Sequence, residues 1–524
     1  MPDAQASYSY APDVTALVQQ GLALHRTGQL DQAVEVYQKV LAAAPDTFDA
    51  LHLLGVVHLQ RGDAARAAEL IGQAISINAR QPAAHGNLAS ALIALRDFTG
   101  AIESCDRALA LKPDDVEAFF NRATALRASG QAQAALANFN QALALQSRHV
   151  QSLVGRGALL RDGGQPEAAL VDFDAALLSA PHDVLVQYNR GNALKDLNRV
   201  SEAEAAFRQA IALNPDFAEA HVALAECLHL AGHADDAWPE YEWRWRTKAF
   251  ASIARDFNVP RWNGRDEIGG KTILIHSEQG LGDTVQFARY ASAVASLGAK
   301  VVLEVQSSLT TLLTNLAGVS SVIAHGTTIP AVDLQCPLMS LPSIFSSVPS
   351  GAAYLKADPN KGGAWKANFG VKAKSRIGIV WSGSTTHAND ARRSIALIAL
   401  APLLATNAEF FSLQKDARQS DRAALANFRQ LKDLSQYLHD MADTAAIMSE
   451  LDLIISVDTV TAHLAGALGK PVWILLPRAP DWRWGLERAN TDWYPSARLY
   501  RQSQRGDWAS VIARVAADLK SFAL

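Results

Sequence analysis

The sequence has few cysteines: Cys105, Cys227 and Cys336 are the three in 524 residues, odd in number and far apart. This count provides no disulfide framework and no cysteine-ligated zinc site, and it fits a reducing cytosol best. The chain also lacks any run of about 18 apolar residues, so we expect no membrane-spanning helix. Its first residues lack the basic-then-apolar pattern of a signal peptide, and we expect a cytoplasmic protein.

The sequence also has no excess of basic over acidic residues. The 48 Lys and Arg residues stand against 52 Asp and Glu residues, which gives a formal net charge of −4. A protein that binds mainly to nucleic-acid phosphates is usually basic, so we expect no nucleic-acid partner. Hydrophobic residues make up 49% of the sequence and charged residues 19%, which excludes a disordered or collagen-like chain.

Tryptophan is absent from the first 237 residues, although the chain contains 11 of them from Trp238 onward. The tryptophan-free part is rich in Ala, Leu and Gln. Such a shift in composition indicates two modules built on different principles, and the first one is internally repetitive.

The first module repeats every 34 residues through seven copies without a slip. Each copy has an alanine, a small residue twelve positions before it, and a larger, mostly apolar residue four positions after it. The alanines are Ala33, Ala67, Ala101, Ala135, Ala169, Ala203 and Ala237; the small residues are Gly21, Gly55, Ala89, Ala123, Gly157, Gly191 and Ala225; the larger ones are Tyr37, Ile71, Cys105, Phe139, Phe173, Phe207 and Tyr241.

This pattern predicts stacked helical hairpins. Small residues let two antiparallel helices approach closely, the larger residue fills the gap against the next hairpin, and a proline ends the second helix in four copies. Gly28, Gly62 and Gly130 fall at the expected turn between the helices. The pattern is similar to the tetratricopeptide repeat, and we expect an α-solenoid over residues 10–247.

A solenoid of this kind has a concave groove lined by the first helix of each pair. Asn87, Asn121 and Asn189 stand two residues before the small residue in three copies, and we expect them to line an acceptor groove. An asparagine amide donates and accepts hydrogen bonds, so it can hold an extended peptide without reading its sequence. The alternative is that these side chains are solvated or cap neighbouring turns.

After about residue 248 the pattern changes to alternating strands and helices. Such alternation predicts α/β structure with parallel, doubly wound sheets. We expect two Rossmann-like halves, over residues 248–370 and 371–524, that face a cleft. The boundary falls in a Lys-, Gly-, Asn- and Asp-rich stretch over 356–374, and ligands should bind at the carboxyl ends of the strands. The expected strands are 271–276, 301–305, 322–323, 332–334, 376–381, 410–413, 453–457 and 472–476.

Gly280, Gly282 and Asp283 follow the first expected strand. Two glycines permit a tight turn and the close approach of a ligand, and Asp283 is expected at the start of the next helix, pointing into the cleft. The alternative is an N-cap aspartate with glycines for the turn.

Ser384, Thr385 and Thr386 follow the first strand of the second set, and Arg393 comes shortly after them. A hydroxyl-rich loop with an arginine can bind phosphate through charge-assisted hydrogen bonds. Lys415 is another cation at a strand end. The alternatives are a solvated loop and an ordinary surface lysine.

Asp458 ends another expected strand, and a helix begins at once with Thr459, Thr461 and His463. The free amides and the dipole of such a helix form an anion site. Asp458 is suited to accept from a ribose or sugar hydroxyl, the threonines to donate to phosphate, and His463 to assist the leaving group. The alternative for His463 is a satisfied core histidine.

These motifs carry a resemblance. The span 248–524 resembles the glycosyltransferase B superfamily, and within it the heptosyltransferase-like enzymes, through the Gly-x-Gly-Asp turn at 280–283 and the Asp-Thr-x-x-x-His-Leu-Ala-x-Ala segment at 458–467. Its combination with tetratricopeptide repeats is similar in layout to the protein O-linked N-acetylglucosamine transferases. It also resembles bacterial repeat-plus-transferase proteins, some of which modify flagellin.

The resemblance implies an inverting, metal-independent glycosyltransferase that needs no cofactor. It would move a sugar from a nucleotide sugar to an acceptor, with protein Ser/Thr hydroxyls held by the repeat groove as the expected acceptor. Asp283 matches the proposed catalytic base. Donor binding is assigned to Gly280, Gly282, Ser384, Thr385, Thr386, Arg393, Lys415, Asp458, Thr459, Thr461 and His463.

Two departures keep an alternative open. Val460 stands where the heptosyltransferase pattern has glycine, and the His-Thr-Thr signature of the O-linked transferases is not reproduced, so the donor cannot be carried over. The alternative is a repeat scaffold whose transferase domain is degenerate. Asp172 and Asp174 form an Asp-x-Asp triplet, but it lies inside a repeat helix, so we expect no metal there. The aromatic residues over 480–484 and 492–495 are expected to wall the sugar pocket or to plug the core between the halves.

Overall fold

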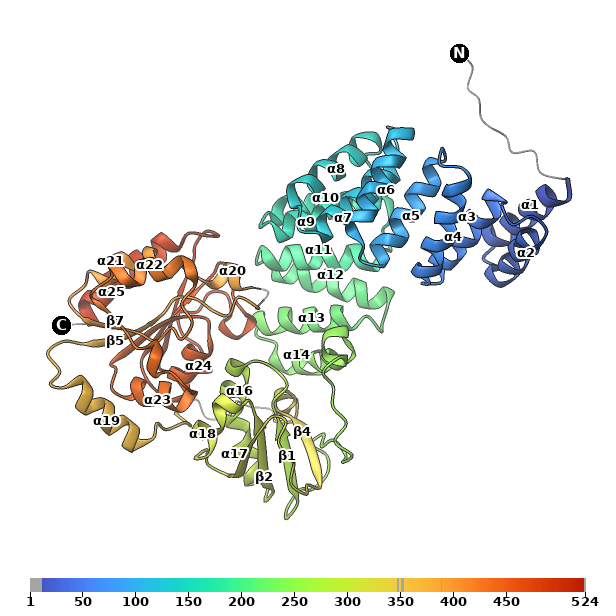
Figure 1. Cartoon of the computed structure of the whole chain (residues 1–524). Coiled ribbons are helices and arrows are strands. Elements are labelled where there is room, and N and C mark those ends of the chain that lie inside the picture. The colour runs from blue at the N-terminus through green and yellow to red at the C-terminus, as the bar shows by residue number, and fades with distance from the viewer. Residues whose placement is uncertain (1–11, 346–347, 350–352, 388, 523–524) are drawn as a thin grey trace. The chain divides into compact units, whose positions relative to one another are not determined.

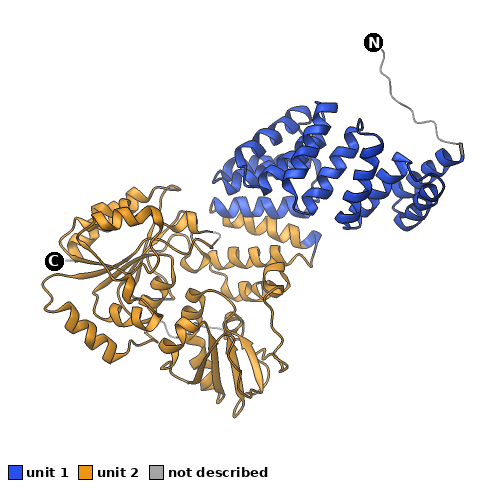
Figure 2. Cartoon of the chain, in the orientation of Figure 1, with its two compact units in different colours: residues 1–197, 212–214 blue, residues 198–211, 215–524 orange. Residues whose placement is uncertain are grey.

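The computed structural model describes residues 12–345, 348–349, 353–387 and 389–522. Contacts divide the chain into two compact units, one of residues 1–197 with 212–214 and one of residues 198–211 with 215–524 (Figure 2). Among the described residues, none of the helices has the length and apolar character needed to cross a membrane.

The first unit is a series of helical hairpins, as the repeat predicts (Figure 1). The paired helices follow one another with short turns between them. Their bounds are α1 (Pro12–Arg26), α2 (Leu30–Ala43), α3 (Phe48–Gln60), α4 (Ala64–Ile77), α5 (Pro82–Ala94), α6 (Phe98–Leu111), α7 (Val116–Ala128), α8 (Ala132–Leu145), α9 (Val150–Asp162), α10 (Pro166–Ser179) and α11 (Val184–Asp196).

The small residues of the repeat are required by close packing. A Cβ atom on Gly157 of α9 would lie 2.7 Å from the ring of Phe173 on α10, so the larger residue fills the gap inside its own hairpin. The sequence predicted packing only against the next hairpin. Phe139 of α8 makes that contact too, because a Cβ on Gly155 would lie 2.5 Å from its ring. Both contacts demand glycine, which explains why two stand so close in this copy.

The turn inside each hairpin needs left-handed backbone. Gly28, Gly62 and Gly130 have φ of +77°, +82° and +81°, which confirms the predicted turn positions. Arg96 occupies the same place in its hairpin, with φ of +64°. Because arginine has a Cβ atom, this left-handed backbone conformation is strained there.

The repeat pattern continues into the second unit and packs there on the α/β part. His229 stacks on Trp482 with ring centroids 4.2 Å apart, and Trp238 meets Phe287 edge-on at 6.0 Å. The helices are α12 (Val200–Leu213), α13 (Ala218–Leu230) and α14 (Ala234–Tyr241), followed by the 3₁₀ helix η1 (Glu242–Arg246) and α15 (Lys248–Ala251).

The first sheet of the second unit is wholly parallel, with strand order β3-β2-β1-β4. Its central strand reads Thr-Ile-Leu-Ile-His, an apolar run buried on both faces, as parallel strands usually are. The elements are β1 (Thr272–His276), α16 (Leu281–Phe287), α17 (Arg289–Ser296), β2 (Lys300–Val305), η2 (Ser307–Leu309), α18 (Thr310–Leu313), β3 (Val319–Ala324), β4 (Leu334–Pro337) and η3 (Leu338–Ser343).

The second sheet is also parallel, with strand order β10-β9-β8-β5-β6-β7. One hydrophobic core runs from Trp238 through Ile273 of the first sheet to Ile454 of the second. The elements are α19 (Pro359–Phe369), β5 (Arg376–Val380), α20 (Asp390–Arg393), η4 (Leu397–Leu400), α21 (Ala401–Leu404), β6 (Glu409–Ser412), α22 (Gln419–Asn427), β7 (Leu431–Asp433), η5 (Ser435–Tyr437), α23 (Met441–Ser449), β8 (Leu453–Val457), α24 (Val460–Ala467), β9 (Val472–Leu476), η6 (Trp482–Trp484), β10 (Ala497–Arg501) and α25 (Trp508–Phe522).

The structure therefore confirms a helical repeat array followed by a region with parallel sheets. The stretch over 356–374, interpreted as a boundary, contains the helix α19. Its Asp358 caps that helix by accepting from the N–H groups of Asn360 and Lys361, a signal present in the sequence but not used.

Candidate functional site

The second sheet reverses its strand order between β5 and β8. In open parallel sheets, ligands bind outside the carboxyl ends of the strands at such a reversal. The loop that begins at Trp381 follows β5, and Asp458 follows β8 directly. Two of the three predicted motifs of the chain therefore lie at the same reversal point.

The loop after β5 exposes its hydroxyl groups. Ser384, Thr385 and Thr386 are all exposed, and the Ser384 and Thr386 hydroxyls lie 2.8 Å apart. The Gly383 N–H donates to Ser394 Oγ at 3.0 Å, which holds the start of this loop against the end of α20. The loop is thus anchored at its base and presents three hydroxyls to solvent.

Arg393 joins the two central strand ends. Its Nη1 donates to the backbone carbonyl of Asp458 at 2.8 Å. Its guanidinium also lies close over Gly383, where a Cβ would come within 2.8 Å of Nη2. Glycine at position 383 therefore makes room for the arginine, and the arginine fixes the spacing of the two loops.

Asp458 and His463 lie together at the start of α24. His463 Nε2 is 3.8 Å from Asp458 Oδ1, and His463 Nδ1 is 3.0 Å from the Tyr494 hydroxyl. Burial, together with the charge of Arg483, lowers the pKa of His463 to about 3. The histidine is therefore neutral at pH 7, and its contact with Asp458 is not an ion pair.

Burial and the nearby Asp481 carboxylate raise the pKa of Asp458, against the attraction of Arg393. A carboxyl of this kind can pick up a proton more readily than an exposed one. The two threonines of the motif differ: Thr459 is half-buried with its hydroxyl 3.1 Å from Ser456 Oγ, whereas Thr461 is buried. Thr459 is thus the more accessible of the two predicted phosphate donors.

Asp283 lies at the start of α16, as predicted, with both carboxylate oxygens engaged. Oδ2 accepts from the Gly280 N–H at 3.0 Å, and Oδ1 pairs with Arg483. Arg483 is buried and also binds Asp481 Oδ1 at 2.9 Å and Gln286 Oε1 at 2.8 Å. Burial acts to lower the pKa of Arg483, but the two carboxylates outweigh it and raise that pKa. Asp283 is therefore the third residue of α16, whose carboxylate accepts from the N–H of the N-cap residue Gly280, and it is the half-buried partner of Arg483.

The motif at 280–283 and the motif at 458–467 meet in space. A Cβ on Gly282 would lie 2.9 Å from His463 Cδ2 and 3.7 Å from Val460 Cα. Glycine at position 282 lets α16 approach the start of α24. Segments about 180 residues apart in the chain are thereby brought together, one from each sheet.

Sequence reasoning missed Arg483, the residue that links these segments. It stands between Trp482 and Trp484, which were noted only as part of an aromatic stretch. Both tryptophans are buried, and Trp484 stacks on His463 with ring centroids 5.3 Å apart. Their burial favours the core plug over the wall of a sugar pocket.

Lys415 lies apart from this group. It is exposed, and its ammonium donates to the carbonyl of His439 at 3.0 Å. No described contact connects it with Arg393 or Asp458.

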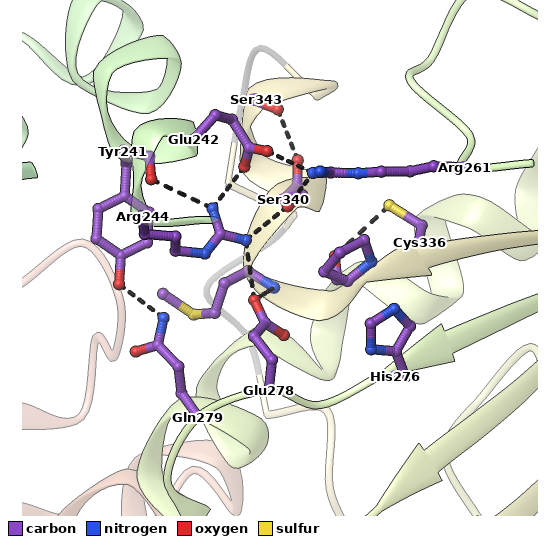
Figure 3. A network of polar contacts seen from close by, with 12 residues as sticks. Tyr241, Glu242, Arg244, Arg261, His276, Glu278, Gln279, Cys336, Ser340 and Ser343 are labelled. Atoms are coloured by element: carbon purple, nitrogen blue, oxygen red, sulfur yellow. Dashed lines mark hydrogen bonds and ion pairs between the residues drawn. The ribbon is translucent and has the colours of Figure 1, made fainter. Parts of the chain in front are cut away.

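A pocket of about 680 Å³ opens at the carboxyl ends of the first sheet. Glu278, just after β1, lines it, and its Oε1 accepts from Arg244 Nη2 at 2.9 Å and from the Met339 N–H at 3.2 Å (Figure 3). Burial raises the pKa of Glu278 to about 7, although Arg244 acts in the opposite direction. Sequence reasoning missed this pocket; the polar run at 276–279 after an apolar strand was the available signal.

The three groove asparagines make contacts within the repeats. Asn87 Nδ2 lies 2.9 Å from His52 Nε2, and Asn121 Nδ2 donates to Ser90 Oγ at 3.0 Å. Asn189 Nδ2 donates to the Leu185 carbonyl of its own helix at 2.9 Å. All three side chains are half-buried, so each retains some exposure for a ligand.

The Asp-x-Asp triplet is used in ion pairs between repeat helices. Asp172 accepts from Arg156 Nε and Nη2 at 2.8 and 2.6 Å, and Asp174 accepts from Arg190 at 2.6 Å. Both carboxylates thus hold helix pairs together.

Comparison with known proteins identifies the repeats. A tetratricopeptide repeat family model matches residues 4–50, 18–82, 52–116, 120–184 and 188–247. The N-terminal region of about 250 residues is therefore an array of tetratricopeptide repeats. Protein FlbA of Caulobacter vibrioides is 28% identical over 354 residues, which are 62% of this chain and 58% of FlbA. The chain thus spans a little over half of that relative's length.

Solved structures of two other proteins match part of the chain. PilF of Pseudomonas aeruginosa is 20% identical, with a TM-score of 0.36 and coverage of 40% of this chain and 94% of PilF. A thermophilic tetratricopeptide repeat protein of Thermus thermophilus is 22% identical, with a TM-score of 0.31 and coverage of 34% of this chain and 98% of that protein.

Proposed function

We propose that the α/β region is a glycosyltransferase that moves a sugar from a nucleotide sugar to protein Ser/Thr hydroxyls held by the repeat groove. The observation that carries the proposal is the meeting of the two motifs. Asp283, after the first sheet's central strand, pairs with Arg483, after the second sheet's β9, and Gly282 packs against His463. A transferase needs its acceptor side and its donor side to meet in this way.

The topology supports the proposal. If the strands of the second sheet are renumbered from 1 starting at β5, their order is 6-5-4-1-2-3, which is the order of a Rossmann fold. The first sheet has the order 3-2-1-4. Two such sheets with their strand ends toward each other would form a glycosyltransferase B architecture. Tetratricopeptide repeats suggest a protein partner, which fits a protein acceptor.

The donor would bind where β5 and β8 end. Arg393 supplies a fixed cation for a diphosphate, and the exposed hydroxyls of Ser384, Thr385 and Thr386 can donate to its oxygens. Asp458 can bind a sugar or ribose hydroxyl. Cations and helix amides would stabilise the leaving diphosphate, so the reaction as proposed needs no metal and no cofactor.

Asp283 would act on the acceptor side. Each of its oxygens already accepts one hydrogen bond and keeps a second lone pair for an acceptor hydroxyl. Attack from this side, opposite the leaving group, would invert the anomeric carbon. The small number of cysteines, three in 524 residues, fits the cytoplasmic location that we propose.

Turnover of a panel of UDP, GDP, ADP and CMP sugars tests the proposal. We expect release of the nucleotide from at least one of them, and a fall of about 10²–10⁴-fold in Asp283→Asn. The exposed Arg422→Ala in the same half serves as the matched control and should keep the rate. Wild-type protein that turns over none of the donors would favour the alternative, a repeat scaffold with a degenerate transferase domain.

A further inference from the structure

The segment between β9 and the end of η6, residues 477–484, carries charged groups of the candidate site. Arg483 pairs with Asp283 and donates to Gln286 Oε1 at 2.8 Å. Asp481 accepts from the Arg483 N–H at 3.0 Å and from its guanidinium at 2.9 Å. The position of this segment therefore sets the position of Arg483 relative to the carboxylate of Asp283.

The segment is stiff, and it is held at its start. Pro477 and Pro480 flank Arg478, and each proline fixes its own φ and restricts the residue before it. The Arg478 N–H donates to Gln502 Oε1 at 3.3 Å, and the Arg478 carbonyl accepts from Asn198 Nδ2 at 2.7 Å. Because few backbone angles are free here, a shift of Arg478 also moves the residues that follow it.

Asn198 belongs to the repeats, where it lies in the turn between α11 and α12. Its φ is +58°, a left-handed conformation that glycine adopts most easily and that asparagine tolerates better than most residues with a Cβ. In the other six copies, the same turn position holds glycine five times and arginine once: Gly28, Gly62, Gly130, Gly164, Gly232 and Arg96. The turn by itself therefore does not require asparagine, whereas the hydrogen bond to Arg478 requires the side-chain amide.

The last repeat contacts the far end of the same segment. His229 of α13 stacks on Trp482 with ring centroids 4.2 Å apart, and Trp238 of α14 meets Trp482 edge-on at 5.6 Å. The Arg483 guanidinium lies over the Trp482 ring, 4.3 Å from its centroid. Ring contacts of this kind tolerate sliding, whereas a hydrogen bond needs a defined distance and angle. The contact from Asn198 is therefore the one that fixes where the segment starts.

The last repeat also contacts the motif on the acceptor side. The Tyr241 hydroxyl accepts from Gln279 Nε2 at 2.7 Å (Figure 3). Gln279 directly precedes Gly280, whose N–H donates to Asp283 Oδ2 at 3.0 Å. Helices of the repeat pattern thus contact both segments that form the pair of Asp283 and Arg483.

We propose that Asn198 is a positioning residue for the sugar transfer, an inference that rests on the function proposed above. Its amide holds residues 477–484 so that Arg483 stays paired with Asp283 and keeps that carboxylate directed at the acceptor hydroxyl. The last two repeats are then part of the transferase site as well as a surface for the acceptor. Because Asn198 acts through the segment and not on the donor, its loss should lower the rate of the chemical step and leave donor affinity unchanged.

Two substitutions separate the amide from the turn. Asn198→Gly removes the amide and keeps a residue that suits the left-handed turn. Asn198→Asp keeps the size of the side chain, but its carboxylate accepts hydrogen bonds and cannot donate to the Arg478 carbonyl. Arg96→Gly changes the same turn position in another repeat and is the matched control.

Hydrogen exchange over residues 477–485, measured by mass spectrometry on the full chain, tests the hold on the segment directly. We expect faster exchange there in Asn198→Gly and Asn198→Asp, and exchange as in wild type in Arg96→Gly. Turnover of UDP, GDP, ADP and CMP sugars, with water or a serine peptide as acceptor, tests the consequence. The kcat of Asn198→Gly should fall about 2–10-fold, as expected for the loss of one neutral hydrogen bond, with an unchanged KM for the donor. Asn198→Asp should lose more.

Each contrary result has its own meaning. If exchange over 477–485 in Asn198→Gly equals that of wild type, Asn198 serves the turn alone and the inference is overturned, whether or not the chain is a transferase. Faster exchange with an unchanged kcat, or a raised donor KM at an unchanged kcat, would overturn the positioning role while the transferase stands. If wild-type protein turns over no donor, the transferase proposal fails, and the role of Asn198 in transfer fails with it.

Discussion

At the scale of single residues, we expect removal of the Arg483 guanidinium to lower the stability of the second unit. It is buried, and it compensates Asp283 and Asp481, which would otherwise be charged and without their partner. We expect Arg483→Leu to lower the free energy of unfolding of the second unit by about 1–3 kcal/mol, the usual cost of leaving polar groups without their partner, because the Asp283 and Asp481 side chains are 23% and 36% exposed and stay partly hydrated. All 11 tryptophans lie at or after Trp238, so tryptophan fluorescence in a urea titration reports on this unit.

The exposed Arg422→Leu is the control for that titration. A midpoint for Arg483→Leu that matches the control would mean that the carboxylates find other partners.

Gly282 gives a second prediction at this scale. Alanine in a helix normally stabilises it relative to glycine, by roughly 0.5–1 kcal/mol. At Gly282 the added Cβ would lie 2.9 Å from His463, so we expect Gly282→Ala to destabilise by about 1–3 kcal/mol. Gly363 in α19 has no neighbouring atom within 4 Å of such a Cβ, so Gly363→Ala should stabilise. Equal rises in melting temperature for both variants would disprove the close approach of α16 and α24.

At the scale of elements, the sequence predicts well the strands that are continuous apolar runs. The central strands β1 and β8 begin and end within one residue of their predicted bounds, because strands buried on both faces read as unbroken apolar runs. β7 and β10 were missed. β7 has three residues, and the pattern of β10, Ala-Arg-Leu-Tyr-Arg, carries charge at a sheet edge. Short or charged edge strands leave little signal in a single sequence.

Within the candidate site, too, the sequence predicts local contacts and misses contacts between distant segments. Asp458 and His463 share one strand-to-helix junction, so their spacing alone placed them together. The pairing of Asp283 with Arg483 joins residues 200 positions apart, and no local spacing encodes it. The contact of Glu278 with Arg244 was missed for the same reason, because Arg244 comes from the end of the repeats.

The helix α13 supplies a pH prediction. His229 lies between Trp238 and Trp482, and its Nε2 has no hydrogen-bond partner among the described residues. Burial lowers the pKa of His229 to about 3, below its unfolded value of 6.5. The stability that this neutral histidine contributes is present above pH 6.5 and is lost as the pH falls toward 3.

His229→Phe keeps an aromatic ring and removes this titration. We expect wild-type protein to lose roughly 2–3 kcal/mol more than the variant between pH 6.5 and 4.5. Fluorescence-monitored unfolding at the two pH values measures the difference. Parallel losses in both proteins would show that the imidazole is solvated.

At the scale of the whole molecule, the proposed function and the division into two units together predict two separable activities. Every residue assigned to the donor lies in residues 198–524. We expect a fragment of 198–524 to bind nucleotide sugar as tightly as the full chain, and a fragment of 1–197 to be helical by circular dichroism, because repeats are stabilised by their neighbours. The repeat fragment should retain the acceptor protein without transferring sugar. If the 198–524 fragment binds the acceptor as tightly as the full chain, the repeat groove does not hold the acceptor.

The central claim is that a nucleotide sugar binds where β5 and β8 end. Calorimetric titration with UDP, GDP, ADP and CMP sugars tests it most directly, with Arg393→Ala compared to the exposed Arg422→Ala. We predict that one donor binds wild-type protein and the control alike, and binds Arg393→Ala at least about tenfold more weakly, since a charge-assisted hydrogen bond contributes roughly 1.5–3 kcal/mol. The difference should shrink at high salt, because ions screen the pair. Equal affinity of Arg393→Ala and wild type, or no binding of any donor, would contradict the account.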